Sequence, residues 1–490
     1  MSKLKKIINQ LADNEIKVIY QSLKKSDAHK SAELLKLFRE NKLSDKEIKN
    51  KLDVHNNAFY TLRSRLNEKI ENHIIEHVET PRTALVQRVA SINEILHTKN
   101  KTIATATLKK LEKELLDYDL SNELTLLYKA LKKLNMHSPD YFEYSQLYNR
   151  HVAYMLAVDK VEDMLADYFK RYSQSLMQGG QHYRESLSLL VEQIQKNHAL
   201  YGSHRLYIYY NCAWIFHKLM VEDVDISSCG EDINEAFAQV EKYFTQYHMD
   251  TTYHNLQWVF LYLRMLYHYK QGHYGMVDEN IFQLKDHAPN LISNYRLYTS
   301  PVYYLIFKIE RSLALGAQKK LFSDNNKVFK SLHVDKDDML TWYVFTYYDA
   351  LSRYYNDQTE DAIECINAFL NESDLKPYPK VYIEIKLLLC HFYFSNHNLE
   401  QVDYNLAQAQ RQLRVIKKEN HAHAYAFMKI LKSSLSDVDF QKRQKKVCRY
   451  IDEFLQQPKP LASPLRLLNT KMYIPKKEVQ KNEHSYETHS

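Results

Sequence analysis

The chain alternates long stretches of helical hydrophobic spacing with short polar breaks. Residues 253–269 carry apolar and aromatic side chains at the three- and four-residue intervals that place them on one face of a helix. Residues 271–274, which include Gly272, interrupt this pattern, and helical spacing resumes over residues 275–287. The pattern therefore predicts two helices joined by a tight turn.

Two later segments repeat the helix, break, helix pattern. Residues 342–370 show it around a break at 356–358, where Gln358 or Thr359 is the expected start of the second helix. Residues 381–416 show it around a break at 396–398. Counted to the start of the next unit, each unit spans roughly 40 residues, a length typical of helical-hairpin repeats.

Glycine is scarce, with 7 residues in a chain of 490. Phosphate-binding loops, nucleophile elbows and β-hairpins all use glycine for positive φ or for close backbone approach. Hydrophobic residues make up 45% and charged residues 26%, which is ordinary for a folded domain. We therefore expect an all-α protein that binds other molecules, without enzymatic activity and without a cofactor.

A chain of this length exceeds what one helical core can bury, and stacked helical units are one way to solve that problem. The units resemble tetratricopeptide-like repeats through Leu263, Tyr267, Gly272 and Tyr274, through Ala350, Tyr354, Ala362 and Ile363, and through Leu388, Phe392, Leu399, Val402 and Leu406. The resemblance implies an α-solenoid of helical hairpins over residues 81–457. It also implies that this body binds a protein or peptide. An irregular helical bundle is the alternative.

A second pattern lies in residues 33–70. A first helix would bury Leu34, Leu37 and Phe38. Ser44 is a good N-cap for a second helix, and Glu47 three residues later completes a capping box. The apolar positions that follow have the spacing of two helices crossing over a small shared core, with a turn at 53–54; they are Ile48, Leu52, Val54, Phe59 and Leu62.

This segment resembles the helix-turn-helix of sigma-type factors and response regulators, which implies binding to double-stranded DNA. It departs from that pattern at Lys49, where the family has a small residue, and at Asp53, where the family has glycine. Asp tolerates the left-handed turn better than most residues, and Lys49 must extend its side chain out of the helix contact.

The resemblance assigns base-contacting and phosphate-contacting side chains to the second and third helices. Asn pairs with adenine edges and Arg with guanine edges, while Lys and Arg bind phosphates. The candidate DNA-binding residues are Lys46, Lys51, His55, Asn56, Asn57, Tyr60, Thr61, Arg63, Ser64, Arg65 and Lys69. The alternative is a helical hairpin that begins the repeat body and binds no nucleic acid.

Charge is unevenly distributed along the chain. Residues 1–75 hold 16 basic and 10 acidic residues, and residues 441–490 hold 11 and 5, so each end has a net charge of +6. The middle, residues 76–440, holds 40 basic and 45 acidic residues, a net charge of −5. Basic ends suit polyanionic partners such as DNA, and they also occur as solubilising termini.

The positions of prolines divide the chain into three predicted parts. A break at 79–81 closes an N-terminal module of residues 1–80. Four prolines after Gln457 end the helical body, and residues 458–490 are expected to form a polar, disordered tail. The five scattered cysteines, the basic N-terminus without a continuous apolar core and the lack of a long apolar run predict a cytoplasmic protein that does not enter membranes.

One fragment has metal-ligand spacing. His73, Glu76 and His77 match the H-x-x-E-H arrangement of inverted zincins, in which two His on one helical face bind zinc. The fragment lies in a charged setting, and no third ligand is evident downstream. We therefore expect no metal site, and zinc-dependent hydrolysis remains a remote alternative.

Overall fold

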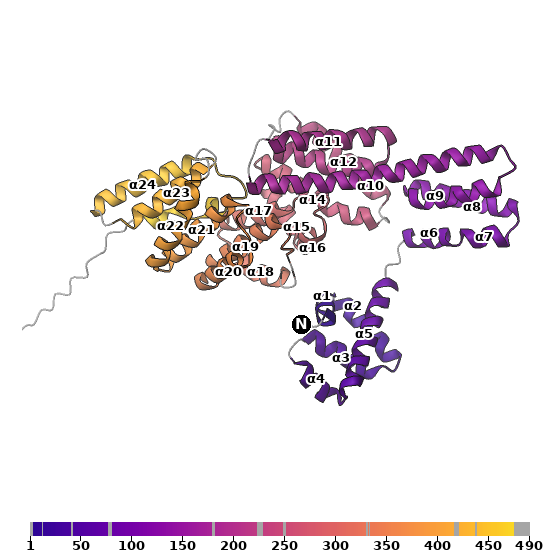
Figure 1. Cartoon of the computed structure of the whole chain (residues 1–490), viewed down its shortest axis with the longest axis horizontal. Helices are drawn as coiled ribbons and strands as arrows, with labels where there is room; N and C mark the ends of the chain where they lie inside the picture. Colours follow the sequence, from indigo (N-terminus) through magenta and orange to yellow (C-terminus); the bar gives the residue numbers. More distant parts are fainter. Residues whose placement is uncertain are drawn as a thin grey trace, which may run out of the picture. The chain divides into compact units, whose positions relative to one another are not determined.

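The computed structural model describes residues 3–474 except 12, 41–42, 77–80, 179–181, 223–228, 248–250, 330–331, 333, 416–420 and 437–438. Every regular element within these residues is a helix, and no strand is found among them. The all-α prediction is therefore confirmed (Figure 1).

The chain divides into two compact units. Unit 1 consists of Met1–Lys160, Ser203–Arg205 and Phe237–Gln257, and unit 2 consists of Val161–Gly202, Leu206–Ala236 and Trp258–Ser490. The long helix α10, Asp140–Gln178, contributes to both. The predicted module boundary lies at residues 79–81. Residues 77–80 are outside the described residues, and α6 begins at Pro81.

The first helices of unit 1 share one hydrophobic core. They are α1 (Lys3–Gln10), α2 (Asp13–Lys25), α3 (His29–Glu40), α4 (Asp45–Leu52) and α5 (Asn56–Glu76). Leu34, Phe38 and Ile48 are completely buried, as the apolar spacing predicts. Lys5 of α1 forms an ion pair with Asp45 at the start of α4, with 3.0 Å between Nζ and Oδ1.

A second core in unit 1 gathers the next helices with the first part of α10. These helices are α6 (Pro81–Ala90), α7 (Ile92–Thr98), α8 (Lys101–Asp117) and α9 (Ser121–Leu134). Leu108, Leu124 and Leu131 are fully buried in it. Asp119, in the turn between α8 and α9, accepts hydrogen bonds from the hydroxyls of Tyr154 and Ser203.

The remaining helices continue the alternation of long helices and short breaks. They are α11 (His182–Tyr201), α12 (His204–His217), the π-helix η1 (Lys218–Glu222), α13 (Gly230–Gln246), α14 (Thr251–Lys270), α15 (Tyr274–Leu284), α16 (Ala288–Asn294), α17 (Val302–Ala314), α18 (Gln318–Val328), α19 (Met339–Tyr354), α20 (Thr359–Glu372), α21 (Pro379–Ser395), α22 (Leu399–Leu413), α23 (Ala422–Ser434) and α24 (Phe440–Gln456). The three predicted helix pairs correspond to α14–α15, α19–α20 and α21–α22. Gln358 is the N-cap of α20, one of the two predicted starts.

Sequential helices of unit 2 pack as antiparallel neighbours joined by short turns. The pairs α17–α18, α19–α20, α21–α22 and α23–α24 are each in contact. The first helix of each pair also packs on the first helix of the next pair, because α17 contacts α19, α19 contacts α21, and α21 contacts α23 (Figure 1, orange to yellow). These first helices are strongly apolar, and α21 buries eleven of its residues, including Leu387, Leu388 and Phe392.

Four hairpin turns share one backbone geometry. A residue with positive φ stands two positions before the second helix, and these residues are Gly272, Gly316, Asp357 and His397. In each turn the next residue donates its N–H to the carbonyl five positions earlier, as Gln358 does to Arg353 at 3.0 Å and Asn398 does to Tyr393 at 3.0 Å. This bonding is that of a Schellman motif, which satisfies carbonyls left free at the helix end.

The described residues after α24 pack against unit 2. They form two short 3₁₀ helices, η4 (Pro464–Leu467) and η5 (Thr470–Tyr473), which contact α21 and α23. Arg466 forms an ion pair with Glu310 of α17, with 2.9 Å between Nη2 and Oε1. Tyr355 of α19 donates a hydrogen bond of 2.6 Å to the Leu467 carbonyl.

This packing corrects the expectation of a polar, disordered tail from residue 458. Helix α24 ends near Gln457 as predicted. However, Leu465, Leu467 and Tyr473 are buried, so residues 458–474 belong to the folded part of unit 2. The prolines correctly predict the end of α24. The apolar side chains that follow pack against helices that are distant in the sequence. Residues 475–490 lie outside the described residues.

Candidate nucleic-acid interface

The start of α4 is set by a capping box. The Ser44 backbone N–H donates to the Glu47 carboxylate at 2.7 Å, and the Glu47 N–H donates to the Ser44 hydroxyl at 3.4 Å. Hydrogen bonds from Ser44 lower the pKa of the Glu47 carboxyl below its usual value. The N-terminal turn of α4 therefore already carries a negative charge from Glu47, and the predicted capping box is confirmed.

The turn between α4 and α5 is left-handed at Asp53. Its φ is 47° and its ψ is 62°, and its N–H bonds to the carbonyls of Asn50 and Lys49 at the end of α4. The Asp53 carbonyl accepts a hydrogen bond of 3.2 Å from Nζ of Lys30 on α3. Asp therefore takes the conformation that the helix-turn-helix family assigns to glycine, and α3 holds the turn in place.

Helices α3, α4 and α5 meet over the predicted apolar residues. Ile48 and Phe59 are at most 1% exposed and Leu52 is 4% exposed, while Val54 and Leu62 are partly buried beside them. The rings of Phe38 and Phe59 contact edge to face, with their centroids 6.5 Å apart. A shared core therefore orients α5 relative to α4.

The side chain of Lys49 leaves the apolar core by extending along the rings of Phe59 and Tyr60. Its ammonium lies 5.3 Å from the centroid of Phe59 and 5.7 Å from that of Tyr60. Nζ donates a hydrogen bond of 2.6 Å to Oδ1 of Asn56. The aliphatic stem thus tolerates the apolar contact, and the side-chain oxygen of Asn56 is already engaged by Lys49.

The exposed face of α5 carries most of the predicted base-contacting residues. Asn56, Asn57, Tyr60, Thr61 and Ser64 are all exposed, and Tyr60 is 56% exposed. Asn57, Thr61 and Ser64 lie opposite the buried Phe59 and Leu66, because a residue advances by about 100° around a helix, and Asn56 and Tyr60 lie at the edge of this face. His55 is also exposed and immediately precedes α5.

The predicted arginines and lysine of α5 do not share one surface. Arg63 is half-buried, and its guanidinium lies 5.5 Å from the centroid of Tyr60, next to the exposed face. Arg65 follows Thr61 by four residues, which places it about 40° from Thr61 on the exposed side of the helix. Arg65 and Lys69 also line a hollow shared with the turn between α2 and α3, beside Asp27. Lys69 is rotated by about 120° from Asn57, so it lies on another flank of α5, whereas Arg65 borders both surfaces.

Two further predicted phosphate contacts lie on α4. Lys46 and Lys51 are both exposed, and they flank the buried Ile48. Because Asp45 and Glu47 occupy the first turn of α4, its N-terminus is a poor site for a phosphate. Any attraction of this helix for a polyanion therefore depends on the two lysine side chains.

The H-x-x-E-H fragment gives no described metal centre. His73 and Glu76 belong to the last turns of α5, their side chains are not described, and His77 lies outside the described residues. Elsewhere, across the parts of the chain that the structure describes, no group of three or more His, Cys, Asp or Glu side chains is arranged to hold a metal ion.

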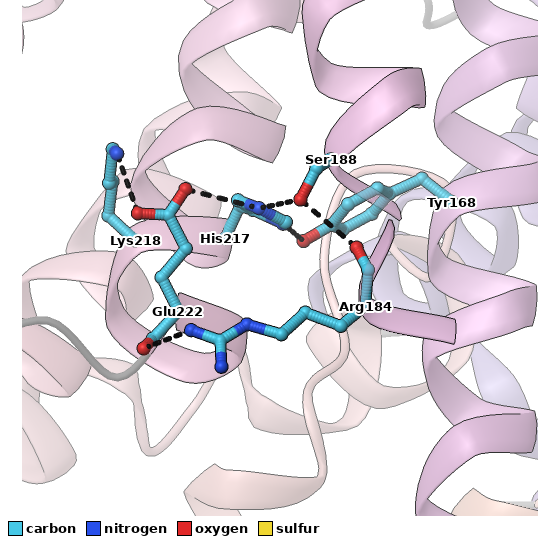
Figure 2. A network of polar contacts seen from close by, with 6 residues as sticks. All are labelled: Tyr168, Arg184, Ser188, His217, Lys218 and Glu222. Carbon is cyan, nitrogen blue, oxygen red and sulfur yellow. Dashed lines mark hydrogen bonds and ion pairs between the residues drawn. The ribbon is translucent and has the colours of Figure 1, made fainter. Parts of the chain in front are cut away.

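A polar cluster in unit 2 was not anticipated from the sequence (Figure 2). His217 ends α12 and is 2% exposed. Its Nδ1 lies 3.1 Å from the Tyr168 hydroxyl of α10, and its Nε2 lies 3.1 Å from the Ser188 hydroxyl of α11. The π-helical turn η1 brings Glu222 to 3.4 Å from the same Nε2.

The cluster differs from a catalytic Ser-His-acid triad in one decisive respect. In a triad the carboxylate holds the imidazole nitrogen opposite the serine. Here Glu222 and Ser188 approach the same nitrogen of His217, and a tyrosine hydroxyl occupies the other (Figure 2). Burial lowers the pKa of His217 to about 4. The arrangement therefore provides hydrogen-bond partners for both ring nitrogens of a buried, neutral histidine.

No sequence signal identified this cluster, because its members lie on four helical elements and only His217 and Glu222 are close in sequence. Cys212 and His217 of the apolar helix α12 are both buried, with exposures of 0% and 2%. Among the described helices, none combines the length and the apolar character needed to cross a bilayer.

The chain was compared with protein-family models, with curated proteins and with solved structures, and no match was found in any of the three comparisons.

Proposed function

We propose that this protein is a non-enzymatic regulatory or scaffold protein with two binding parts. Its N-terminal helices α3–α5 bind double-stranded DNA, and the helices of unit 2 form a tetratricopeptide-like solenoid that binds a protein or peptide. The observation that carries the DNA-binding part is the geometry around Asp53, where a capped α4, a left-handed turn and a shared core present one uniformly exposed face of α5.

The side chains on that face have suitable chemistry. Asn57 offers an amide that can pair with an adenine edge, and Thr61 and Ser64 offer hydroxyls for either bases or phosphates. Arg63 beside Tyr60, with Lys46 and Lys51 on α4, would contact the backbone. Arg65, about 40° from Thr61 around α5, would contact the backbone as well, and Lys69 is left out of this interface because it lies at the hollow on another flank of α5.

The DNA-binding part is tested by titrating the full chain against a fluorescent duplex at about 50 mM and about 200 mM salt. Binding should weaken with salt, because phosphate contacts release counterions. Replacing both Lys46 and Lys51 by alanine should lower the magnitude of the salt slope by about 2, since each lysine neutralises one phosphate.

Variants of α5 separate the proposed face from its other flank. Asn57→Ala and Arg65→Ala should weaken duplex binding, whereas Lys69→Ala should change it much less. Absence of salt-dependent binding by the full chain would leave a pure protein-interaction solenoid as the better description. An equal loss with Lys69→Ala and Arg65→Ala would contradict the assignment of the face.

The repeat part rests on the recurring turn. Left-handed residues at Gly272, Gly316, Asp357 and His397 recur about every 40 residues with the same hydrogen bonds, and the first helices α17, α19, α21 and α23 pack on one another in turn. Units that contact chiefly their neighbours are characteristic of solenoids, which offer extended binding surfaces.

Partner binding by this part is tested by crosslinking the full chain through its lysines in an extract of its source cells. Crosslinks from a partner protein should map to lysines of unit 2, such as Lys319 and Lys320 on α18. Partner crosslinks confined to lysines of unit 1 would contradict the proposal.

A further inference from the structure

A cavity of about 570 Å³ lies within unit 2, between α10 and the N-terminal ends of α17 and α19. One wall is a stripe of α10 with residues three or four positions apart, namely Ala166, Phe169, Lys170, Ser173, Gln174 and Met177. Because each residue advances a helix by about 1.5 Å, this stripe is about 17 Å long. That length matches about five residues of extended peptide. The volume lies in the range of ligand-binding cavities.

The opposite wall is held rigid by an arginine clamp. Arg296, between α16 and α17, donates hydrogen bonds of 3.1 Å to Asp338 and 3.0 Å to Asp335. Asp338 in turn caps α19 by accepting the Thr341 N–H at 3.2 Å. Hydrogen bonds from the Asp337 N–H and from Arg296 lower the pKa of Asp335. The carboxylates of Asp335 and Asp338 therefore stabilise this wall of the cavity.

Thr299 is the observation that points to a ligand. It lines the cavity and is completely buried, and its hydroxyl has no hydrogen-bond partner among the described residues. A buried hydroxyl without a partner costs free energy. Because the side chain is completely buried, a ligand bonds to it only after a small shift of this wall, and the hydrogen bond then formed would gain affinity.

The other lining groups combine apolar and polar character. Phe169 and Met177 are buried and offer apolar contact, while Ser173 and Gln174 of the same stripe offer hydrogen bonds. Lys170 and Asp337 line the cavity with opposite charges. An extended peptide has apolar side chains, backbone amides and two oppositely charged ends, and it complements every one of these features.

We infer that this cavity binds a short extended peptide of about five residues, with apolar side chains against Phe169 and Met177 and a backbone group bonded to Thr299. The inference rests on the proposed role of unit 2 as a peptide-binding or protein-binding body and assigns the ligand class and its place. The mixed lining favours a peptide over a purely apolar ligand, which would leave Ser173, Gln174 and Thr299 without hydrogen bonds.

The test is affinity selection of pentapeptides with free termini from a synthetic pool by the full chain, followed by titration of an enriched, labelled peptide. Ala166→Trp places a large side chain in the cavity from an exposed position on α10, and Ala407→Trp makes the same change on the exposed side of α22 as a control. Binding should be lost with Ala166→Trp and unchanged with Ala407→Trp.

Thr299→Val keeps the shape of the side chain but removes its hydroxyl, and it should weaken the enriched peptide by about tenfold. Enrichment of no pentapeptide, or equal binding by the wild-type chain and Ala166→Trp, would overturn the inference. Neither result would affect the duplex titration, which probes unit 1, or the partner crosslinks. Failure of the cavity is therefore distinguishable from failure of the proposed function.

Discussion

Acidification should destabilise unit 2 through His391. This side chain of α21 is completely buried, with Nδ1 2.6 Å from the Tyr473 hydroxyl of η5. Its Nε2 is buried without a hydrogen-bond partner among the described residues. Burial lowers the pKa of His391 from 6.5 to about 3, because a charged imidazolium would lose its hydration there. The folded protein therefore keeps this histidine neutral at pH values well above 3.

The sign of the effect follows from the lowered pKa. Since the unfolded chain binds the proton first as the pH falls below about 6.5, the stabilising contribution is complete above that pH and is lost progressively toward pH 3. With the folded-state pKa at about 3, the free energy of unfolding should fall by about 2 kcal/mol between pH 7 and pH 5 from this residue alone.

The assay is urea denaturation followed by tryptophan fluorescence, because Trp214, Trp258 and Trp342 all lie in unit 2. His391→Gln will lower stability at pH 7, but it should reduce the difference between pH 7 and pH 5 by about 2 kcal/mol. Tyr473→Phe removes the hydrogen bond and keeps the buried imidazole, so it should retain most of the wild-type difference. An unchanged pH difference in His391→Gln would refute the reasoning.

Three other changes probe local features. Arg466→Met leaves the half-buried Glu310 without its ion-pair partner and should lower the free energy of unfolding of unit 2 by about 2 kcal/mol in the same urea assay; no change would mean that this ion pair adds no stability. Ser44→Ala removes the capping box and should speed hydrogen exchange of α4 amides about fivefold, a loss of about 1 kcal/mol. Asp53→Gly relieves a left-handed aspartate and should slow that exchange about twofold; faster exchange would argue that Asp stabilises this turn.

The positions of helices were predictable because helix formation leaves a local signal. Apolar spacing located α14, α19 and α21 within a few residues, and the Ser44–Glu47 pair located the start of α4. Hydrogen bonds along a helix join residues four positions apart, so the information needed is close by in the sequence.

The repetition of the left-handed turn could not be recognised from residue type alone. Glycine marks the turns at Gly272 and Gly316, but Asp357 and His397 adopt the same left-handed conformation without it. The packing of one first helix on the next selects this turn geometry and outweighs the modest preference of Asp and His for other conformations. Sequence inspection for glycine therefore underestimates the repetition.

The candidate sites also combine features that the sequence predicts with features that depend on tertiary contacts. The exposed face of α5 was largely predictable, because the spacing of Ile48, Leu52 and Phe59 determines which side is buried. The placing of Lys69 at a hollow beside that face depends on where the turn between α2 and α3 lies, and this is a tertiary contact. The same holds for the cavity beside Thr299, whose walls come from segments more than one hundred residues apart.

Local signals in the sequence were thus enough to predict an all-helical chain, the limits of its main hairpins and the capped helix before Asp53. Three further features came from long-range packing: residues 458–474 fold onto α21 and α23, His391 is buried under Tyr473, and α10 forms one wall of a cavity. Helical periodicity reports which side of a helix avoids water, whereas the identity of the covering surface depends on shape complementarity between distant segments.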